Sequence, residues 1–239
     1  MNTLQVDDLI ELYRTYGARQ YGREAVSQLE HALQCAYLAE TAGATPALVA
    51  ASLLHDVGHM VWHSAPAAKA GAGGNARKGP LQGLLDYLAS GESHEYQHTP
   101  AEQAALRDNK QRANDLHEHR AQWFLENLFG PEVLEPIRLH VEAKRYLCCV
   151  EQGYWDILSP ESKHSLEVQG GPHDADQARR FARMDHAADA VQLRRWDDSA
   201  KVPGARTPDL EHYKKILEAV ALRVRPATSV TSMPAPSAA

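Results

Sequence analysis

Apolar residues recur at helical spacing along most of this chain, and no segment shows the strict alternation that is typical of a β-strand. Ser27 and Glu30 form a capping box, and Gly43 supplies the matching stop, which predicts a helix over about 28–42. The other predicted helices span 4–16, 45–62, 99–129, 131 to at least 144, a short segment from 159, 174–198 and 207–222. The sequence therefore predicts an all-α fold.

One stretch departs from this helical pattern. Residues 64–80 are rich in Ala and Gly and residues 90–98 are polar, so 64–112 is predicted to be an insertion that is partly loop. Long loops usually have a function, and this one is a candidate lid or contact in a homo-oligomer. The segment 226–239 is rich in Pro, Ser, Thr and Ala. We expect one domain over 1–225, followed by a disordered tail over 226–239.

Composition limits the classes of function. The net charge of −6 argues against a general nucleic-acid surface. The N-terminus has no apolar segment of the signal-peptide type, and no stretch approaches the ~20 apolar residues that span a bilayer. Cys35, Cys148 and Cys149 lack zinc-ligand spacing and are interpreted as reduced thiols. We therefore expect a cytoplasmic protein that binds neither nucleic acid nor a membrane.

The candidate chemistry begins with a His-Asp doublet. His55 and Asp56 close an apolar helical run, and adjacent side chains on a helix point about 100° apart, so the two can hold different sides of one metal site. His59 lies four residues after His55 and is expected on the same face. Taken alone, such a doublet is more often incidental than metal-binding, but the rest of the chain changes that interpretation.

Five predicted helices each offer one or two imidazole or carboxylate groups. The candidate metal ligands are His31, His55, Asp56, His117, His140 and Asp197. This set suits iron, manganese, zinc or nickel rather than a thiolate site. Six protein ligands exceed what one open catalytic site uses, so we expect two metal ions with Asp56 as their bridge. His119 competes with His117 for its place in the set.

The order of these ligands resembles the six-ligand, dinuclear branch of the HD-domain superfamily, which is named after its His-Asp doublet. His117-Glu118 followed by Ala121 resembles the helix start of that branch and favours His117 over His119, although Ala121 replaces the usual glycine. Further motifs resemble the PhnZ-like mixed-valence di-iron oxygenases, which split the carbon–phosphorus bond of hydroxyphosphonates. These motifs are Tyr21-Gly22-…-Glu24, the run from His140 to Leu147, Ser162-…-Ser165, and the run from Arg194 to Asp198 with Lys201.

The resemblance implies a single HD-domain helical bundle that holds two iron ions and is active in the Fe(II)/Fe(III) state. It assigns His31, His55, Asp56 and Asp197 to one ion, and Asp56, His117 and His140 to the other, which keeps positions open for substrate. It also implies that Tyr21 covers the vacant iron position until substrate arrives. Glu24 would then accept an ammonium group of the substrate.

Two cations are expected beside the metals, because Lys144 lies one turn after His140 and Arg194 lies three residues before Asp197. A tetrahedral dianion is well served by one guanidinium, one ammonium and short hydroxyls. The predicted substrate-binding residues are Glu24, His59, Lys144, Ser162, Ser165 and Arg194. Tyr21, His59 and Lys144 are predicted to take part in catalysis.

Several of these residues also have a purely structural interpretation. Lys144 suits a surface lysine, Ser162 suits a helix start, and Tyr21 suits a packing aromatic. Arg194 and Asp198 have the spacing of a surface salt bridge along one helix. The functional interpretation depends on the fact that all of these residues have sequence positions that place them beside the candidate ligands.

The sequence therefore predicts a di-iron oxygenase that uses O2 to cleave the C–P bond of a 1-hydroxy-2-aminoethylphosphonate or an N-methylated relative. The expected products are phosphate and glycine or an N-methylated glycine. The main alternative is an HD phosphohydrolase acting on a nucleotide or phosphoester, in which a metal-bound hydroxide attacks phosphorus. An inositol-oxygenase-like activity on a polyol and a catalytically silent sensor module are further alternatives.

Overall fold

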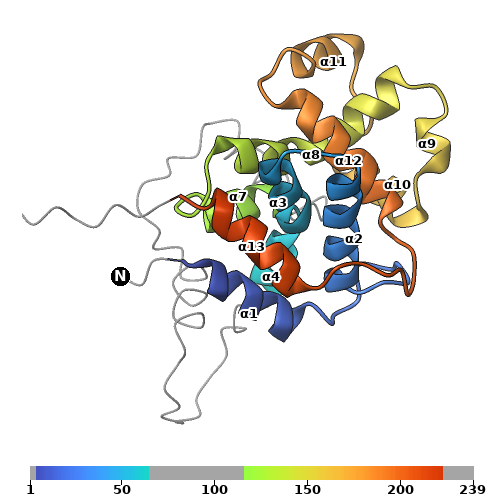
Figure 1. Ribbon diagram of the computed structural model, residues 1–239. Coiled ribbons are helices and arrows are strands. Elements are labelled where there is room, and N and C mark those ends of the chain that lie inside the picture. Colours follow the sequence, from blue (N-terminus) through green and yellow to red (C-terminus); the bar gives the residue numbers. More distant parts are fainter. Residues whose placement is uncertain (1–3, 65–115, 223–239) are drawn as a thin grey trace, which may run out of the picture.

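The computed structural model describes residues 4–64 and 116–222, and it gives the side-chain surroundings for all of these except 62–64 (Figure 1). Apart from residue 64, the predicted insertion over 64–112 lies outside the described residues. The predicted tail over 226–239 and the part of the predicted helix 99–129 that precedes residue 116 lie outside them as well.

The regular secondary structure of the described residues is helical, and loops join the helices, which confirms the predicted all-α class. Its helices are α1 (Val6–Tyr16), α2 (Gln28–Thr41), α3 (Pro46–Leu54), α4 (Val57–Ser64), α7 (His117–Leu125), α8 (Pro131–Val150), α9 (Tyr154–Ile157), α10 (Pro160–Val168), α11 (Ala175–Phe181), α12 (Ala187–Ser199) and α13 (Leu210–Val220). Over the same residues, β-type pairing is limited to two isolated bridges, Gln20 with Ser27 and Phe129 with Ala221. Within the described ranges, no helix is long and apolar enough to cross a membrane.

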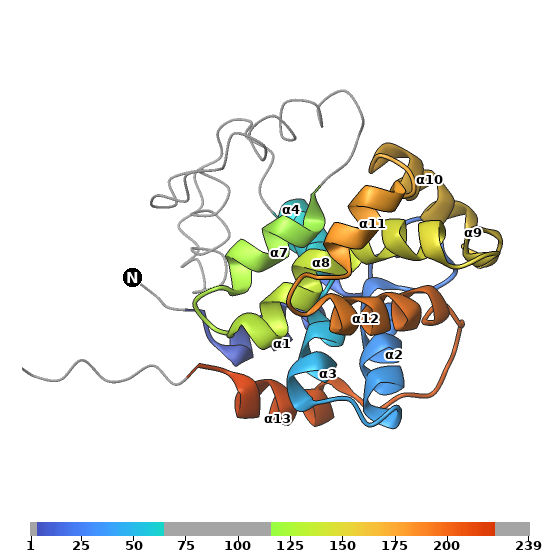
Figure 2. The ribbon, with the colours of Figure 1, turned by 90° about the horizontal axis from the view of Figure 1, so that it is seen from above.

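Helix α3 lies at the centre of the bundle, where it packs against α2, α8, α12 and α13 (Figure 2). Thr45 caps its first turn by accepting a hydrogen bond from the Leu48 amide, and Pro46 occupies its first position. Every residue from Leu48 to Leu54 is buried. A helix that is apolar all round is stable only inside a protein. The His-Asp doublet follows directly after Leu54, so this burial carries it into the interior.

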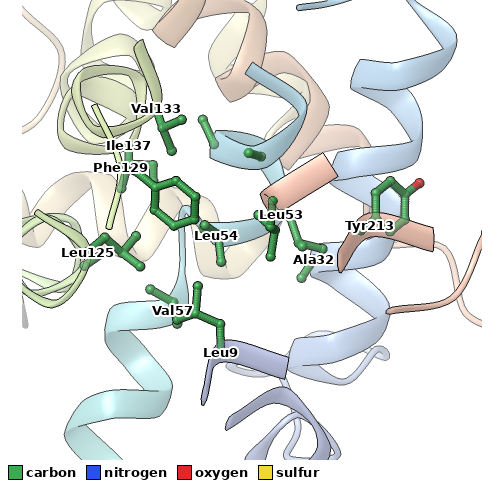
Figure 3. Packing of buried hydrophobic residues seen from close by; sticks show 14 of the residues in the cluster. Leu9, Ala32, Leu53, Leu54, Val57, Leu125, Phe129, Val133, Ile137 and Tyr213 are labelled. Carbon is green, nitrogen blue, oxygen red and sulfur yellow. The ribbon is translucent and has the colours of Figure 1, made fainter. Parts of the chain in front are cut away.

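The main apolar core surrounds the end of α3 and joins it to α1, α7 and α8 (Figure 3). Its members include Leu9, Leu53, Leu54, Val57, Leu125, Phe129, Val133 and Ile137, all with almost no exposed surface. Burying one such side chain stabilises the fold by about 1.5–3 kcal/mol. Tight packing here fixes the positions of the helices that carry the candidate ligands.

Two predicted helices are interrupted in the structure. The predicted helix 45–62 ends at Leu54 and resumes as α4 at Val57, so His55 and Asp56 occupy the turn between two helices. The predicted segment 174–198 divides into α11 and α12, because His186 adopts a left-handed backbone conformation with φ of 61° just before Ala187. Periodicity alone did not reveal either break, because the apolar spacing continues across both.

The last helix also begins later than predicted. Its cap is Asp209, whose side chain accepts a hydrogen bond from the His212 amide, and α13 starts at Leu210. The cap expected at Thr207 was therefore wrong by two residues. Asp and Thr are both good capping residues, and the sequence offered both within one turn.

Gly58 is required where α4 approaches α7. A Cβ atom at this position would lie 2.0 Å from the carbonyl oxygen of His117, far inside van der Waals contact. Replacing Gly58 by Ala should push α7 outward and displace the His117 ring. We expect a loss of about 1–3 kcal/mol in the free energy of unfolding. Metal content should fall in the same variant, as measured by elemental analysis.

Gly43→Ala is the matched control for this prediction. Gly43 has φ of 71°, and an added Cβ would meet nothing within 4 Å. Gly43→Ala should therefore lower the free energy of unfolding by about 1–2 kcal/mol through backbone strain alone and leave the metals in place. Unchanged metal content in Gly58→Ala would show that the contact between α4 and α7 does not position His117.

Candidate metal centre

The six predicted ligands meet in the interior from five parts of the fold. His31 lies on α2, the doublet lies in the turn after α3, His117 begins α7, and the remaining two lie on α8 and α12. All six are buried. His31 Nε2 is 3.2 Å from His55 Nε2, and His117 Nε2 is 3.1 Å from His140 Nε2. Two pairs of ring nitrogens therefore converge, as metal ligands would.

Asp56 lies between the two pairs and presents one carboxylate oxygen to each. Its Oδ2 is 3.7 Å from His31 Nε2 and 3.3 Å from His55 Nε2. Its Oδ1 is 3.3 Å from His117 Nε2 and 3.7 Å from His140 Nε2. A carboxylate in this position can bind one metal ion through each oxygen, which is the geometry of a bridge.

Asp197 completes the first group. Its Oδ1 is 3.5 Å from His31 Nε2, and its Oδ2 is 3.8 Å from His55 Nε2. Asp56 Oδ2 and Asp197 Oδ1 are both buried and have no hydrogen-bond partner within the protein. Buried polar atoms are nearly always satisfied, so orphaned carboxylate oxygens that face imidazole nitrogens fit a metal ion.

Backbone carbonyls orient three of the imidazoles from behind. His31 Nδ1 lies 2.9 Å from the Ala200 oxygen, His55 Nδ1 2.9 Å from the Ser52 oxygen, and His140 Nδ1 2.6 Å from the Ile137 oxygen. Because a carbonyl only accepts, each Nδ1 must carry the proton and donate it. The lone pair of each Nε2 is then directed at the centre, as metal-binding histidines require.

The electrostatics of the cluster favour the metal-binding forms of His31, His140 and Asp56. They do not do so for His55, because Asp56 and Asp197 outweigh its burial and raise its pKa. Burial lowers the pKa of His31 to about 4 and lowers that of His140 well below its usual value. Burial alone would raise the pKa of Asp56, but His55 and His117 outweigh it and hold the pKa well below the usual range. Neutral imidazoles and ionised carboxylates are the forms that bind a divalent ion.

The structure brings His117, and not His119, to the centre. His117 is buried, whereas the His119 side chain is 30% exposed and its Nε2 lies 3.9 Å from Glu118 Oε1. The His59 ring stacks on that of His117 with centroids 4.1 Å apart, and its Nε2 is 3.9 Å from Asp56 Oδ1. His59 therefore borders the second group of ligands, whereas His55 belongs to the first, because the helix expected to carry both residues on one face is interrupted at the doublet.

Sequence reasoning missed one neighbour of the centre. Cys35 is buried one turn after His31, and its Sγ is 3.6 Å from His31 Nε2. Burial, Asp197 and Asp56 raise the pKa of this thiol well above its usual value, so it stays protonated. The spacing of four residues on one helix was the available signal. Cys35 therefore forms part of the wall of the site beside His31.

A pocket of about 560 Å³ opens beside the second group of ligands. It is lined by every predicted substrate-binding or catalytic residue, namely Tyr21, Glu24, His59, Lys144, Ser162, Ser165 and Arg194, and by Asp56, His117, His140 and Asp197. The residues selected from sequence motifs thus share one cavity with the candidate metal centre.

Tyr21 covers the first group of ligands. Its ring stacks on His31, with centroids 3.9 Å apart and an interplanar angle of 12°. Burial and the nearby Asp197 raise the pKa of its phenol well above the usual value, so the phenol remains protonated. The alternative interpretation of Tyr21 as a packing aromatic is correct in part, because the surface on which it packs is a candidate ligand.

Lys144 is a buried lysine of the pocket rather than a surface lysine. Its side chain is almost fully enclosed, and Nζ donates a hydrogen bond of 2.6 Å to Ser165 Oγ. Burial and the like charge of Arg194 lower the pKa of Lys144 to about 7. A lysine with this pKa is only partly charged near neutral pH, and an anion in the pocket would restore its charge.

The lowered pKa of Lys144 predicts a pH dependence of anion binding. A phosphonate stabilises the charged lysine, so binding above pH 7 should be accompanied by proton uptake. Affinity should be highest below the pKa of about 7 and should fall as pH rises through it. Calorimetry in buffers of different ionisation enthalpy measures this uptake. Lys144→Gln should abolish it, and unchanged uptake in that variant would exclude Lys144 as the source.

Arg194 is fully engaged by carboxylates. Its Nη1 lies 2.6 Å from Asp197 Oδ2, its Nε donates to Asp198 Oδ2 at 2.9 Å, and its Nη2 pairs with the other oxygen of Asp198. Tyr154 donates a further hydrogen bond of 2.5 Å to Asp198. The predicted pair of Arg194 with Asp198 exists, but it is buried rather than on the surface. Arg194 therefore positions Asp197 as well as bordering the pocket.

Lys201 also lines the pocket, and Ser159 contacts its neighbour Glu24. Lys201 Nζ donates to Ser162 Oγ at 2.8 Å and lies 3.5 Å from Glu24 Oε1. Ser159, the cap of α10, donates a hydrogen bond of 2.5 Å to the same oxygen of Glu24. Ser159 was not predicted as a site residue, and the sequence analysis identified Lys201 only as part of a motif. The reason is that Glu24, which both residues contact, lies far from them in the sequence.

Comparison with known proteins agrees with this geometry, although no family model matches the chain. The chain is 38% identical to a hydroxymethylphosphonate dioxygenase from Gimesia maris over 214 aligned residues. These residues cover 90% of this chain and 87% of that relative. The chain belongs to the PhnZ-like phosphonate dioxygenases. A second relative is the glycine-betaine-forming [1-hydroxy-2-(trimethylamino)ethyl]phosphonate dioxygenase of Leisingera caerulea. It is 28% identical to this dioxygenase over 202 aligned residues, which cover 84% of this chain and 83% of that relative.

The family confirms two predictions made from the sequence. The resemblance to the oxygenases of phosphonate catabolism was correct, and so was the expectation of an enzyme that cleaves C–P bonds oxidatively. Two groups of side chains in the described part of this dioxygenase lie close enough together to hold a metal ion, namely His31 with Cys35 and His55, and Asp56 with His59 and His117.

Proposed function

We propose that this dioxygenase holds two iron ions in the Fe(II)/Fe(III) state and uses O2 to cleave the C–P bond of a small 1-hydroxyphosphonate. The observation that carries the proposal is the position of Asp56, whose two oxygens face two separate groups of buried imidazoles. Imidazole and carboxylate ligands suit redox-active iron. The pocket beside them supplies a buried ammonium and serine hydroxyls for a phosphonate.

The two groups of ligands would hold the ions unequally. His31, His55, Asp56 and Asp197 offer four side chains to one ion, and Asp56, His117 and His140 offer three to the other. The second group faces the pocket and leaves more positions for substrate. When bound, the irons would supply the activation of O2 and the electron transfer, while the protein supplies orientation and charge.

The pocket residues would divide the remaining tasks. Lys144, with Ser165 as its hydrogen-bond partner, would bind the phosphonate oxygens, and Ser162 would add a hydroxyl. His59 borders the second group of ligands and is placed to contact the C1 hydroxyl. Tyr21, stacked on His31, would keep water from the first ion until substrate arrives.

The overall reaction balances with O2 as the only co-substrate. One C1–H bond and the C1–P bond are broken and together supply the electrons that reduce O2. The carbon fragment leaves as a carboxylate, and phosphorus leaves as phosphate without a change of oxidation state. Hydroxymethylphosphonate would give formate, and 1-hydroxy-2-aminoethylphosphonate would give glycine.

Two substrates fit this proposal. The sequence favours 1-hydroxy-2-aminoethylphosphonate or an N-methylated relative, because Glu24 lines the pocket and can meet an ammonium group. Hydroxymethylphosphonate is the second candidate, because Glu24 already has a cationic neighbour in Lys201 and the relative from Gimesia maris carries that substrate in its name. A cytoplasmic location, a homo-oligomer and the absence of nucleic-acid partners remain predictions from the sequence.

The metal content and low-temperature EPR spectrum of gently purified protein test this proposal. We expect about two iron atoms per chain and a mixed-valence signal that changes when a 1-hydroxyphosphonate is added. A phosphohydrolase with the same six ligands would need neither iron nor a mixed-valence state. Full occupancy by zinc or magnesium, with turnover of a phosphoester, would favour that alternative.

A further inference from the structure

Gln34 joins helix α2 to the irregular segment that follows α12. Its side-chain Nε2 donates a hydrogen bond of 3.0 Å to the Val202 carbonyl oxygen, and its Oε1 accepts one of 3.0 Å from the Val202 amide. Gln34 is only 5% exposed, so water competes little for these bonds. Both polar groups of one buried side chain are therefore engaged by the backbone of a single, distant residue.

The segment that Gln34 holds also holds His31. Ala200, two residues before Val202, accepts the hydrogen bond of 2.9 Å from His31 Nδ1. His31 and Gln34 lie three residues apart on α2 and share one face of that helix. The helix therefore contacts the segment at two neighbouring points, of which one is a candidate metal ligand.

The segment depends on such contacts for its position. Residues 200–209 belong to no helix, and Val202 is 56% exposed, so apolar burial does not hold this residue. The Ala200 amide makes a long bond of 3.3 Å back to the last turn of α12, and Lys201 contacts the pocket wall. Gln34 is the anchor on the side of α2.

The position of Ala200 determines which ring nitrogen of His31 carries the proton. A neutral imidazole has one ring proton, on either Nδ1 or Nε2. The Ala200 oxygen favours Nδ1, but Asp197 Oδ1 and Asp56 Oδ2 lie 3.5 and 3.7 Å from Nε2 and could accept a hydrogen bond from it. If Ala200 moved away in the metal-free protein, these carboxylates would favour the Nε2–H form. That tautomer has no Nε2 lone pair for a metal ion.

We propose that Gln34 is a positioning residue for the first metal ion. By holding Val202, it keeps the Ala200 carbonyl against His31 and so keeps the His31 lone pair directed at the metal. The inference rests on the proposed function and adds to it a residue that should affect the first ion and spare the second. His140, a ligand of the second group, is oriented by a carbonyl of its own helix.

Nuclear magnetic resonance of metal-free protein with isotope-labelled histidine tests the proposal without iron. Long-range proton–nitrogen spectra distinguish the two tautomers, and the His31 signals are those that disappear in His31→Gln. The wild type should show the Nδ1–H form. Gln34→Met has a similar volume but no amide, and it should convert a clearly resolved fraction of His31 to the Nε2–H form. Gln34→Glu can still accept from the Val202 amide and should give a smaller shift in the same direction.

Anaerobic titration with Fe(II) measures the consequence for metal binding. His117→Ala is the background, because it should retain the first ion alone. There, Gln34→Met should weaken Fe(II) binding by about tenfold, the lower end of the effect that is typical of residues behind a metal ligand. In a His31→Gln background, which should retain the second ion alone, Gln34→Met should leave the Fe(II) affinity unchanged.

Asp209→Ala is the control for a general loosening of the segment. Asp209 lies at the other end of residues 200–209 and caps α13. Its loss should lower the melting temperature by about 2–4 °C, as the loss of a helix cap usually does. The His31 tautomer and the Fe(II) affinity should nevertheless stay as in the wild type.

The possible failures are distinguishable. An unchanged His31 tautomer or an unchanged affinity for the first Fe(II) in Gln34→Met and Gln34→Glu would overturn the role of Gln34 and leave the proposed function intact. The same changes in Asp209→Ala would also overturn it, because they would reflect loosening alone. If the wild type binds no Fe(II), the proposed function fails and this inference fails with it.

Discussion

Asp56→Ala is expected to lose both metal ions together and all oxygenase activity. The two oxygens of Asp56 face different groups of imidazoles, so one side chain contributes to both ions. Without Asp56, each metal ion has one protein ligand fewer. Each ion also loses the negative charge of the carboxylate, which neutral imidazoles cannot replace. Elemental analysis of the purified variant, together with a circular dichroism spectrum that verifies folding, measures this outcome.

His117→Ala provides the comparison for this prediction. His117 belongs to the second group of ligands alone, so its loss should release one ion and leave the other held by His31, His55 and Asp197 with Asp56. If Asp56→Ala retained one ion at full occupancy, Asp56 would not be the bridge. The division of ligands between two ions would then have to be redrawn.

Arg194→Ala is expected to disturb the first group of ligands as well as the pocket. Arg194 satisfies Asp197 and Asp198 at once, and all three side chains are largely enclosed. Removing one partner of a buried ion pair typically costs about 3–5 kcal/mol, because the remaining charge stays buried and unpaired. We expect a loss of that order in the free energy of unfolding and a lower content of the ion bound by Asp197.

The sequence assigned Arg194 to substrate binding, a role whose loss would leave the metals in place. Arg195→Ala is the neighbouring control, because Arg195 pairs with Glu151 near the surface, with side chains about 40% exposed. Arg195→Ala should lower the free energy of unfolding by no more than ~1 kcal/mol. Full metal content and wild-type stability in Arg194→Ala would mean that Arg194 serves only the substrate.

The convergence of the candidate ligands could be predicted in part from the sequence, because local rules place several of them. Capping signals placed His31 near the start of α2, and the apolar run of α3 carried the doublet into the core. Helical spacing from His140 placed Lys144 in the same pocket. The choice of His117 over His119 came from the resemblance, and the structure agrees through the burial of His117.

What could not be predicted depends on contacts between distant segments. The neighbours of Glu24 are Ser159 and Lys201, which reach it only after α10 and the end of α12 have packed in place. Arg194 pairs with two carboxylates that lie within four residues of it in the sequence. The burial that strengthens these ion pairs depends on the packing of the other helices. For this reason the sequence treated Glu24 as available to a substrate ammonium, whereas the structure shows it beside a lysine.

The central claim, oxidative C–P cleavage at this centre, is tested most directly by recording O2 uptake and phosphate release together. Iron-loaded protein is mixed with hydroxymethylphosphonate or 1-hydroxy-2-aminoethylphosphonate in air-saturated buffer and, in parallel, without oxygen. The account predicts that phosphate appears only where O2 is consumed, and in equal amount. Phosphate released from either compound without oxygen uptake would contradict it.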